Sequence, residues 1–357
     1  MTRTASDTVT VVVPAYNEEA FIAQCLTSVV EDPMMEVLVV DGGSTDATRA
    51  VVTALMPRFP GLRLVDNPGR TAACAMNIGL AEATGSFIVR LDAHSTYPPG
   101  YVRRLTAALR EHDADVAGGV WIARARNGTV LGRAIAAAVT NPWVMGNAGY
   151  RVGGGDVRVV DTVPFGCWHA ETLRRVGGYN ERLHRSQDYD LSQRLKVMGA
   201  KIVLVPDVLI EYYARSGLWE NIRYNFWNGY WVGHPMVASA VRFSARHLIP
   251  ALACLLGVLL VAASLAVSSA WPLLLAAPYL VVLVMSGLAA VREGLVVAAC
   301  LPVITAATHV LYGFGTFYGL FRGALARRER PPGSRNHAHS IRSGGVAPGT
   351  SESPVDR

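Results

Sequence analysis

The stretch Phe87-Ile88-Val89-Arg90-Leu91-Asp92-Ala93-His94 decides the fold of this chain. Its apolar beginning predicts a buried strand, and it ends in Asp92 and His94, whose side chains can both bind a metal ion. Because strand side chains repeat with period two, these two are expected to point off the same edge of a sheet. The pair indicates a clamp for a divalent cation, although the motif alone fits a surface turn equally well.

Two further polar strand exits precede this one. The apolar run 9–13 ends at Pro14, and the apolar run 37–40 ends at Asp41. Each exit leads into a segment with apolar residues at helical spacing. This alternation of strand and helix predicts a parallel, right-handed α/β sheet whose ligand crevice lies at the carboxyl ends of the strands.

The helices of these units are expected to begin at polar residues. Asn17 is predicted to cap the first helix, with Glu18 in its first turn, and Ser44 or Thr45 to cap the second. A third unit leads into an Ala-rich helix over residues 71–83. All three units therefore bring their polar residues to the same crevice.

The absence of two motifs limits which ligands this crevice is expected to bind. No GxGxxG follows the first strand and no GxxxxGK[ST] occurs anywhere, so the sequence has neither a dinucleotide fingerprint nor a P-loop. A divalent cation and helix N-termini can together neutralise the charge of a diphosphate. We therefore expect a nucleoside diphosphate.

Composition sets the broad class of protein. The chain has 357 residues, of which 51% are hydrophobic, and this excess is concentrated after residue 247. The formal net charge is +6, but basic residues are scattered in the first half and gather near the apolar segments, which favours contact with anionic lipid and argues against nucleic-acid binding. Five widely spaced cysteines without a CxxC motif indicate a reducing compartment.

Membrane segments are expected in the last third. Residues 248–269 and 271–290 are long enough to span a bilayer, and 294–320 is a third apolar stretch. The aromatic and basic segment 218–247 predicts an interfacial amphipathic helix, and the tail 322–357 is expected to be basic and disordered. Three spans place the tail outside, whereas the arginines at its start favour the inside, so the topology stays open between two and three spans over residues 248–321.

Five motifs occur in an order that resembles a family 2 glycosyltransferase of the GT-A fold. RLDAHSTYP (90–98) and VDTVPFGCW (160–168) further resemble the succinoglycan-type exopolysaccharide glucosyltransferases. The likeness covers roughly residues 8–230 and implies a Rossmann-like mixed sheet with helices on both faces, in a catalytic domain over residues 1–217. The five motifs are PAYNEE (14–19), VVDGGSTDAT (39–48), NPGRTAACAMNIGLAEATG (67–85), VRLDAH (89–94) and GGYNERLHRSQDYDLSQRLKVMG (177–199).

The resemblance implies a nucleotide site at the strand ends. Asp41 falls where the family's acid holds the nucleobase, which favours UDP sugars, with simple capping of the turn as the alternative. Tyr16 is a stacking wall or a packed tyrosine, and Arg70 can present a planar fork to phosphate. The expected nucleotide-binding residues are Pro14, Ala15, Tyr16, Asn17, Glu18, Asp41, Ser44, Arg70 and Asn77.

The resemblance also assigns the metal and the base. Asp92 and His94 match the family's Asp-x-Asp metal motif with histidine at its last position, which suits Mn²⁺ better than Mg²⁺. Asp188 matches the general base of the family's Glu-Asp-x-Asp-Leu motif, in which Gln187 replaces the usual glutamate; a helix cap is the alternative for Asp188. Trp168 and Gln187 are candidates for the acceptor site, and buried packing is the alternative for Trp168.

These expectations add up to an inverting, metal-dependent glycosyltransferase that moves a sugar, glucose from UDP-glucose, onto a lipid-linked saccharide for exopolysaccharide or envelope glycan. The N-terminus, residues 1–7, has no apolar core, so no signal peptide is expected and the catalytic domain should stay cytoplasmic on a bacterial-type inner membrane. A polyprenyl-phosphate glycosyltransferase and a non-catalytic membrane scaffold are the alternatives.

Overall fold

A computed structural model describes residues 8–29, 35–146, 150, 155–238 and 245–328. Its N-terminal part is built on one mixed sheet of nine strands, in the order β3-β2-β1-β4-β8-β6-β9-β5, with β7 paired to β9. The strands are β1 (Val9–Ala15), β2 (Glu36–Asp41), β3 (Leu62–Asp66), β4 (Phe87–Arg90), β5 (Ser95–Thr96), β6 (Val116–Ala125), β7 (Arg158–Val159), β8 (Cys167–His169) and β9 (Ile202–Ala214).

The first four strands are parallel, as the alternating pattern predicts. In the register, Ala15 of β1 lies beside Asp41 of β2, and Asp41 lies beside Asp66 of β3, so these strands end at one level. β4 also pairs with β1 in parallel, whereas β8 is antiparallel to β4 and β6. The polar residues that follow the parallel strands therefore meet at one edge of the sheet.

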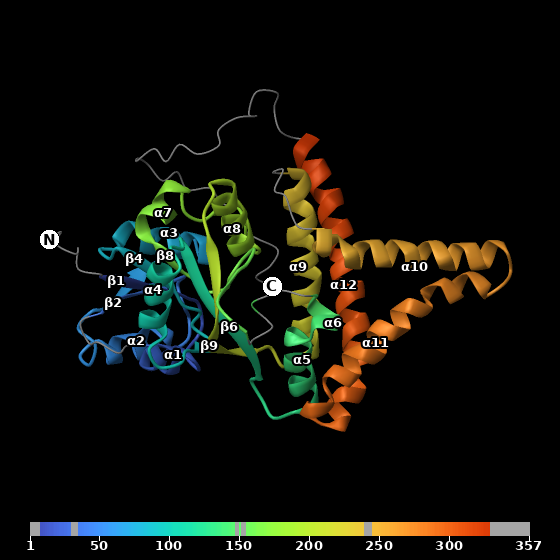
Figure 1. Cartoon of the computed structure of the whole chain (residues 1–357), viewed down its shortest axis with the longest axis horizontal. Helices are drawn as coiled ribbons and strands as arrows, with labels where there is room; N and C mark the ends of the chain where they lie inside the picture. The colour runs from blue at the N-terminus through green and yellow to red at the C-terminus, as the bar shows by residue number, and fades with distance from the viewer. Residues whose placement is uncertain (1–7, 30–34, 147–149, 151–154, 239–244, 329–357) are drawn as a thin grey trace.

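Helices cover both faces of this sheet and close two apolar cores (Figure 1). Val11 and Val13 of β1 face one core, whereas Val12 of the same strand faces the other. The helices of this part are α1 (Ile22–Val29), α2 (Thr48–Leu55), α3 (Ala72–Glu82), α4 (Tyr101–Glu111), α7 (Ala170–Arg175) and α8 (Gln187–Val197).

Two of the predicted helix caps are wrong. Helix α1 begins only at Ile22, after a turn in which the Glu18 carbonyl accepts from the Phe21 and Ile22 amides, so Asn17 lies outside the helix. Helix α2 begins after Ala47, and the hydroxyl of Ser44 is bound to Asp41 instead of to a helix amide. The caps fail because the polar residues of both loops bind each other across the sheet edge.

The C-terminal third forms a helical layer beside the sheet. The helices α5 and α12 pack against each other, and α9 runs along α12, whereas α10 and α11 project away as a hairpin (Figure 1). The helices are α5 (Val130–Thr140), α6 (Pro142–Met145), α9 (Leu218–Ala238), η2 (Ala245–Leu248), α10 (Ile249–Ala266), η3 (Trp271–Ala276), α11 (Ala277–Ala289), η4 (Val291–Glu293) and α12 (Leu295–Arg328).

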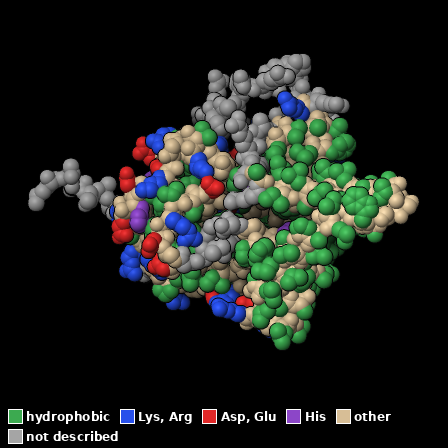
Figure 2. Space-filling model, turned by 45° about the vertical axis from the view of Figure 1, so that its right-hand side comes forward, with side chains coloured by type: hydrophobic (Ala, Val, Ile, Leu, Met, Phe, Trp, Pro, Cys, Tyr) green, Lys and Arg blue, Asp and Glu red, His purple; other side chains and the backbone are tan. Residues whose placement is uncertain are grey.

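Three segments of the described residues are long and apolar enough to cross a bilayer, and they agree with the three apolar stretches of the sequence. They are Ile249–Ala266, Trp271–Ala289 and Leu295–Arg327. Hydrophobic side chains cover this side of the molecule, whereas charged side chains gather over the part that contains the sheet (Figure 2). The expected disordered tail lies outside the described residues from 329 onward, as do residues 1–7.

Glycines allow α9 and α12 to approach closely. A Cβ atom at Gly315 or Gly319 of α12 would collide with the backbone carbonyls of Phe226 and Tyr230 on α9. In the other direction, a Cβ at Gly229 of α9 would collide with the Tyr312 carbonyl. Small residues spaced four apart on facing helices permit this backbone contact. The predicted interfacial helix is thus bound along its length to the last apolar helix.

Candidate active site

A pocket opens at the carboxyl ends of β1, β2 and β4, where the strand exits were expected to meet. Val40 and Leu91 supply part of its floor, and Arg90 lines it from β4. The loop after β3 adds Asn67, Thr71 and other residues at the start of α3. Of the residues predicted from the sequence, Pro14, Ala15, Tyr16, Glu18, Arg70, Asp92 and His94 line this pocket.

His94 lies between two carboxylates in the pocket. Its Nδ1 is 2.9 Å from Oδ1 of Asp92 and 2.9 Å from Oε1 of Glu18. Burial opposes protonation of the ring, but Asp92 and Glu18 together outweigh it and raise the pKa of His94 to about 9. The imidazole therefore holds a proton at neutral pH and joins the two carboxylates. Among the described residues, no group of three or more His, Cys, Asp or Glu side chains is arranged to hold a metal ion by itself.

A stack of aromatic rings packs against the imidazole of His94. The ring centroid of Tyr212 on β9 lies 5.3 Å from that of His94. Trp121 on β6 stacks on Tyr212 at 4.6 Å, with an angle of 3° between the ring planes. Because Trp121 also stacks on Phe165, the stack ties the metal-motif loop to the parallel strands β6 and β9.

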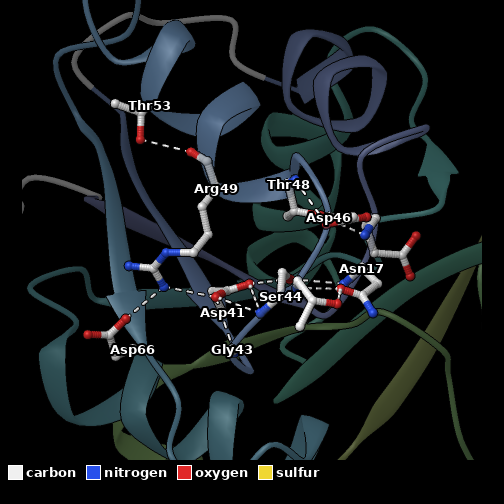
Figure 3. A network of polar contacts seen from close by, with 11 residues as sticks. Asn17, Asp41, Gly43, Ser44, Asp46, Thr48, Arg49, Thr53 and Asp66 are labelled. Atoms are coloured by element: carbon white, nitrogen blue, oxygen red, sulfur yellow. Dashed lines mark hydrogen bonds and ion pairs between the residues drawn. The ribbon is translucent and has the colours of Figure 1, made fainter.

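The carboxylate of Asp41 is bound within its own turn (Figure 3). It is buried and accepts hydrogen bonds from the amides of Gly43 and Ser44 and from the Ser44 hydroxyl. Nη1 of Arg49 lies 2.8 Å from Oδ2 of Asp41 and 2.7 Å from Oδ1 of Asp66. Burial opposes its ionisation, yet the bonds from Ser44 and Arg49 hold the pKa of Asp41 below its usual value. This geometry agrees with the capping alternative, and binding of the base by Asp41 stays a prediction.

Asn17 connects the first loop to the second. Its backbone has a positive φ of 54°, and its side-chain oxygen accepts from the Thr45 amide at 2.8 Å. The Asn17 amide in turn donates to the hydroxyl of Ser44 at 2.9 Å, which extends the network around Asp41 (Figure 3). Asparagine tolerates this left-handed backbone better than most residues. Asn17 and Ser44 therefore shape the loop beside the pocket.

Tyr16 keeps an open ring at the mouth of the pocket. Its side chain is 49% exposed, so it is not the packed tyrosine of the alternative interpretation. Arg70 is exposed at the same mouth and has a positive φ of 55° in the turn before α3. Both side chains are free to close on a ligand, so stacking on Tyr16 and a phosphate contact from Arg70 stay predictions.

Asp188 is connected to the pocket by an ion pair with Arg90, which lines the pocket. The two side chains form an ion pair across 98 residues of sequence, in which Arg90 is buried and Asp188 is partly exposed. The guanidinium of Arg90 also lies 5.9 Å from the ring of Phe165 and 5.8 Å from that of Tyr179. Asp188 is in the first turn of α8, and the residue that caps this helix, Ser186, makes no side-chain cap bond. The cap alternative for Asp188 is therefore wrong, whereas its role as base stays a prediction.

Seven of the predicted site residues are not among those that line the pocket. Besides Asn17, Asp41, Ser44 and Asp188, described above, they are Asn77, Trp168 and Gln187. Asn77 holds the loop before α8, because its amide bonds the backbone N–H and C=O of Tyr179. Trp168 is only 3% exposed and packs edge-on against Tyr179, in agreement with the buried-packing alternative. Gln187 begins α8 next to Asp188 and is partly exposed. The nucleotide contact of Asn77 and the acceptor contact of Trp168 gain no support from this geometry.

Comparison with known proteins identifies the domain. Residues 10–172 match the family described as Glycosyl transferase family 2. The mannosyltransferase PcManGT from Pyrobaculum calidifontis, solved in complex with GDP-Man and Mn²⁺, has a TM-score of 0.56 at 20% identity, covering 89% of this chain and 88% of that chain. Residues 10–172 are therefore a family 2 glycosyltransferase domain, and the fold is the expected GT-A fold.

Two curated relatives indicate which glycosyltransferases the chain resembles. The succinoglycan biosynthesis protein ExoA of Rhizobium meliloti (strain 1021) is 31% identical over 225 residues. That match covers 58% of this chain and 64% of ExoA, just under two thirds of its length. The dolichyl N-acetyl-alpha-D-glucosaminyl phosphate 3-beta-D-2,3-diacetamido-2,3-dideoxy-beta-D-glucuronosyltransferase of Methanococcus voltae is 22% identical over 88% of this chain and 98% of its own length. The chain is thus similar to a protein of exopolysaccharide biosynthesis as well as to a lipid-linked sugar transferase.

Proposed function

We propose that this protein transfers a sugar from a nucleotide-sugar donor to a hydroxyl of a lipid-linked acceptor, with inversion at the anomeric carbon. One observation carries the proposal: Arg90 lines the same pocket as Asp92 and His94 and forms an ion pair with Asp188. The proposed donor clamp and the proposed base are therefore connected by a single buried side chain. A direct displacement needs both groups at one crevice.

Asp188 is the proposed general base. The acceptor hydroxyl must lose a proton as its oxygen attacks the anomeric carbon, and a carboxylate within reach can take it. The carboxylate of Asp188 is partly exposed, whereas Asp190 on the same helix is buried and bonded to Nε of Arg194 at 2.9 Å. Of these two acids, only Asp188 can meet an acceptor that enters from solvent or from the membrane side.

The donor set around His94 suits a divalent cation. Asp92 and Glu18 offer carboxylate oxygens and His94 offers an imidazole, a mixture that favours Mn²⁺ over Mg²⁺. Asp92 and His94 would hold the ion, and further ligands would come from diphosphate oxygens. When bound, such a cation would supply charge neutralisation for the departing nucleoside diphosphate. Because His94 is protonated at neutral pH, it must release its proton to become a ligand.

The names of the relatives support the class of substrates. The donor bound to the P. calidifontis enzyme is GDP-Man, and the M. voltae relative is named for a dolichyl phosphate sugar as its acceptor. ExoA is named for succinoglycan biosynthesis. We favour a UDP-sugar donor, with UDP-glucose as the first candidate, and a lipid-linked saccharide acceptor.

The packing of α12 favours one membrane arrangement. Its first half packs on α5 through Val297, Leu301 and Ile304, and its second half runs along α9 through glycines. Both α5 and α9 follow strands of the catalytic sheet after a short loop, so both ends of α12 stay beside that domain. At 34 residues, or about 50 Å, α12 is longer than a bilayer requires.

We therefore infer that α12 lies along the membrane surface and that only the hairpin of α10 and α11 enters the bilayer. The exposed face of α12 is apolar from Leu295 to Phe321, as lipid contact requires, and the exposed Arg322 and Arg327 lie near its C-terminal end. In this proposed arrangement Arg322 and Arg327, at the end of α12, would lie on the side of the catalytic domain, as expected for basic residues on the cytoplasmic side of an inner membrane. The arrangement has two crossings, which is compatible with a basic C-terminal end on that side.

A transfer assay with membranes tests the proposed function. Membranes that contain the full-length protein are incubated with Mn²⁺ and a panel of radiolabelled nucleotide sugars, and the label in the lipid extract is counted. Transfer is expected from one UDP-sugar and is expected to be lost in Asp92→Ala and in EDTA. Nucleotide-sugar binding without transfer to any lipid would favour a non-catalytic scaffold, and undiminished transfer by Asp92→Ala would remove Asp92 from the donor clamp.

A further inference from the structure

A cluster of arginines lies between the pocket and the membrane helices. Arg185 precedes α8 by two residues, and Arg215 directly follows β9. The guanidinium of Arg185 lies 5.1 Å from the ring centroid of Tyr224 on α9, and that of Arg215 lies 4.5 Å from the same centroid. Two cations of the catalytic domain thus converge on one aromatic ring of the interfacial helix.

Neither guanidinium has a carboxylate partner in the described part of the chain. Nη1 of Arg185 donates to Oδ1 of Asn228 at 2.8 Å, a neutral acceptor, and Arg215 forms no ion pair with any described Asp or Glu. The charges of Asp92 and Glu220 act on Arg215 only from a distance. Partly buried guanidinium groups without an anion are uncommon, because a desolvated charge needs compensation.

The two arginines differ in their electrostatic surroundings. Burial, together with the positive charges of Arg215 and Arg223, lowers the pKa of Arg185, whereas the acidic groups around Arg215 outweigh its burial and raise its pKa. Stacking on Tyr224 holds the planar groups and leaves N–H donors available for a bound anion. A guanidinium fork matches two oxygens of a phosphate group, so the expected ligand is a phosphate.

The position of the arginine cluster indicates which substrate's phosphate it is suited to bind. Arg185 is three residues before Asp188, a chain distance of at most about 11 Å, so the cluster lies beside the proposed base. Tyr224 and Asn228 belong to α9, which α12 ties to the apolar side of the molecule. The cluster therefore connects the loop that carries Asp188 with a helix that packs on the apolar layer.

We propose that Arg185 and Arg215, held against Tyr224, bind the phosphate or diphosphate that joins the acceptor saccharide to its lipid. The inference rests on the proposed function, because it assumes a lipid-linked acceptor. It deepens that function in one respect: with the phosphate held so near Asp188, the attacking hydroxyl belongs to a sugar close to the lipid. The donor diphosphate would be neutralised separately, by the cation that Asp92 and His94 would hold.

Binding of farnesyl diphosphate to the full-length protein in nanodiscs tests the site. Calorimetry is expected to show that Arg185→Gln and Arg215→Gln each weaken farnesyl diphosphate binding by about tenfold or more, since a charge-assisted bond to phosphate is lost. Arg182→Gln, an exposed arginine of the same loop, is the matched control and should bind as the wild type does. Farnesol, which lacks the phosphate, should not bind measurably better to the wild type than to either variant.

Other probes separate the possible sources of phosphate. UDP affinity is expected to stay at the wild-type value in both glutamine variants, and an equal loss of UDP affinity would overturn the proposal by assigning the arginines to the donor. Vesicles of phosphatidylglycerol that compete as well as farnesyl diphosphate would also overturn it, in favour of a general lipid-headgroup site. Unchanged farnesyl diphosphate affinity in both variants would reject the site outright.

Stability and activity measurements keep the two proposals apart. If a glutamine variant does not fold, Arg215→Lys keeps the charge without the planar fork and is expected to bind farnesyl diphosphate several times more weakly; wild-type affinity in this variant would overturn the assignment. Weakened binding in the variants of a protein that transfers no sugar would uphold the site and reject the transferase. Normal sugar transfer together with normal farnesyl diphosphate binding in both variants would reject the phosphate site but leave the proposed transferase function standing.

Discussion

Arg90 and Asp188 form an ion pair in which the arginine is buried and the aspartate is partly exposed. Arg90 comes from the strand that carries the metal motif, and Asp188 comes from the first turn of α8. The arginine therefore orients the carboxylate while leaving part of it open to an acceptor. Two predictions about Asp188 follow from this asymmetry, one for catalysis and one for stability.

Asp188→Asn is expected to lower turnover roughly 10²- to 10⁴-fold at saturating donor, the usual contribution of a general base. The affinity for UDP-sugar should stay near the wild-type value. Because Arg90 loses its charged partner, the variant should also lose about 1–3 kcal/mol of stability, read from a melting curve. The matched control is Asp190→Asn, which breaks the pair with Arg194 on the same helix and should destabilise without a comparable loss of turnover. Transfer above about a tenth of the wild-type rate would remove Asp188 from the mechanism.

His94 should make stability depend on pH in metal-free buffer. Its pKa is raised to about 9 by Asp92 and Glu18, well above its ordinary value of about 6.5. The protonated ring therefore contributes stability that is complete below about pH 6.5 and is lost as the pH rises through 9. The melting temperature of the wild type should exceed that of His94→Gln at pH 6, and the difference should shrink by pH 9.5. A difference that is constant across this range would contradict the shared proton.

Gly315→Ala is expected to separate α12 from α9. The new methyl group would collide with the Phe226 carbonyl, and overpacking of this kind costs typically about 1–3 kcal/mol. The control is Gly257→Ala in α10, where a Cβ meets nothing within 4 Å and where alanine improves helix propensity. Melting of the detergent-solubilised protein should fall for the first variant and hold or rise for the second. Equal melting temperatures would show that the glycine contact is not needed.

The C-terminus should lie on the side of the catalytic domain. Fusion of green fluorescent protein after Arg357 should give a fluorescent product in a bacterial host, and fusion of alkaline phosphatase at the same place should be inactive, because the enzyme matures only outside the cytoplasm. The reverse pattern would mean that α12 crosses the bilayer. A fusion at the N-terminus serves as the reference for the side of the catalytic domain.

Local patterns in the sequence were sufficient to predict the crevice. The strand exits at Pro14, Asp41 and Asp92 each follow a short apolar run, and in a parallel sheet such exits meet because every strand ends at the same edge. Pro14 and Asp92 line the pocket, whereas Asp41 is bound within its own turn and is not among the lining residues. Arg90 could have been noticed as well, since an arginine inside an otherwise apolar strand needs a buried partner.

Contacts between distant segments could not be read from the same patterns. The partner of Arg90 is 98 residues away, and Asn77 binds a loop 102 residues away, so no local spacing indicates either bond. The helix caps failed for the same reason: Asn17 bonds across to the Thr45 amide, 28 residues on, instead of to its own helix. Tyr212 and Arg215 were not predicted, because their importance depends on where β9 lies in the sheet.

The short connection between β9 and α9 has a further consequence. Tyr212 of β9 touches His94, and α9 starts at Leu218, so only a few residues separate the metal-motif loop from a helix fixed to the apolar layer. In the proposed membrane arrangement, the crevice would therefore be held at a constant height above the lipid surface. Such a fixed height acts as a ruler: among the hydroxyls of a membrane-anchored glycan, only those that stand at that distance from the bilayer can be reached.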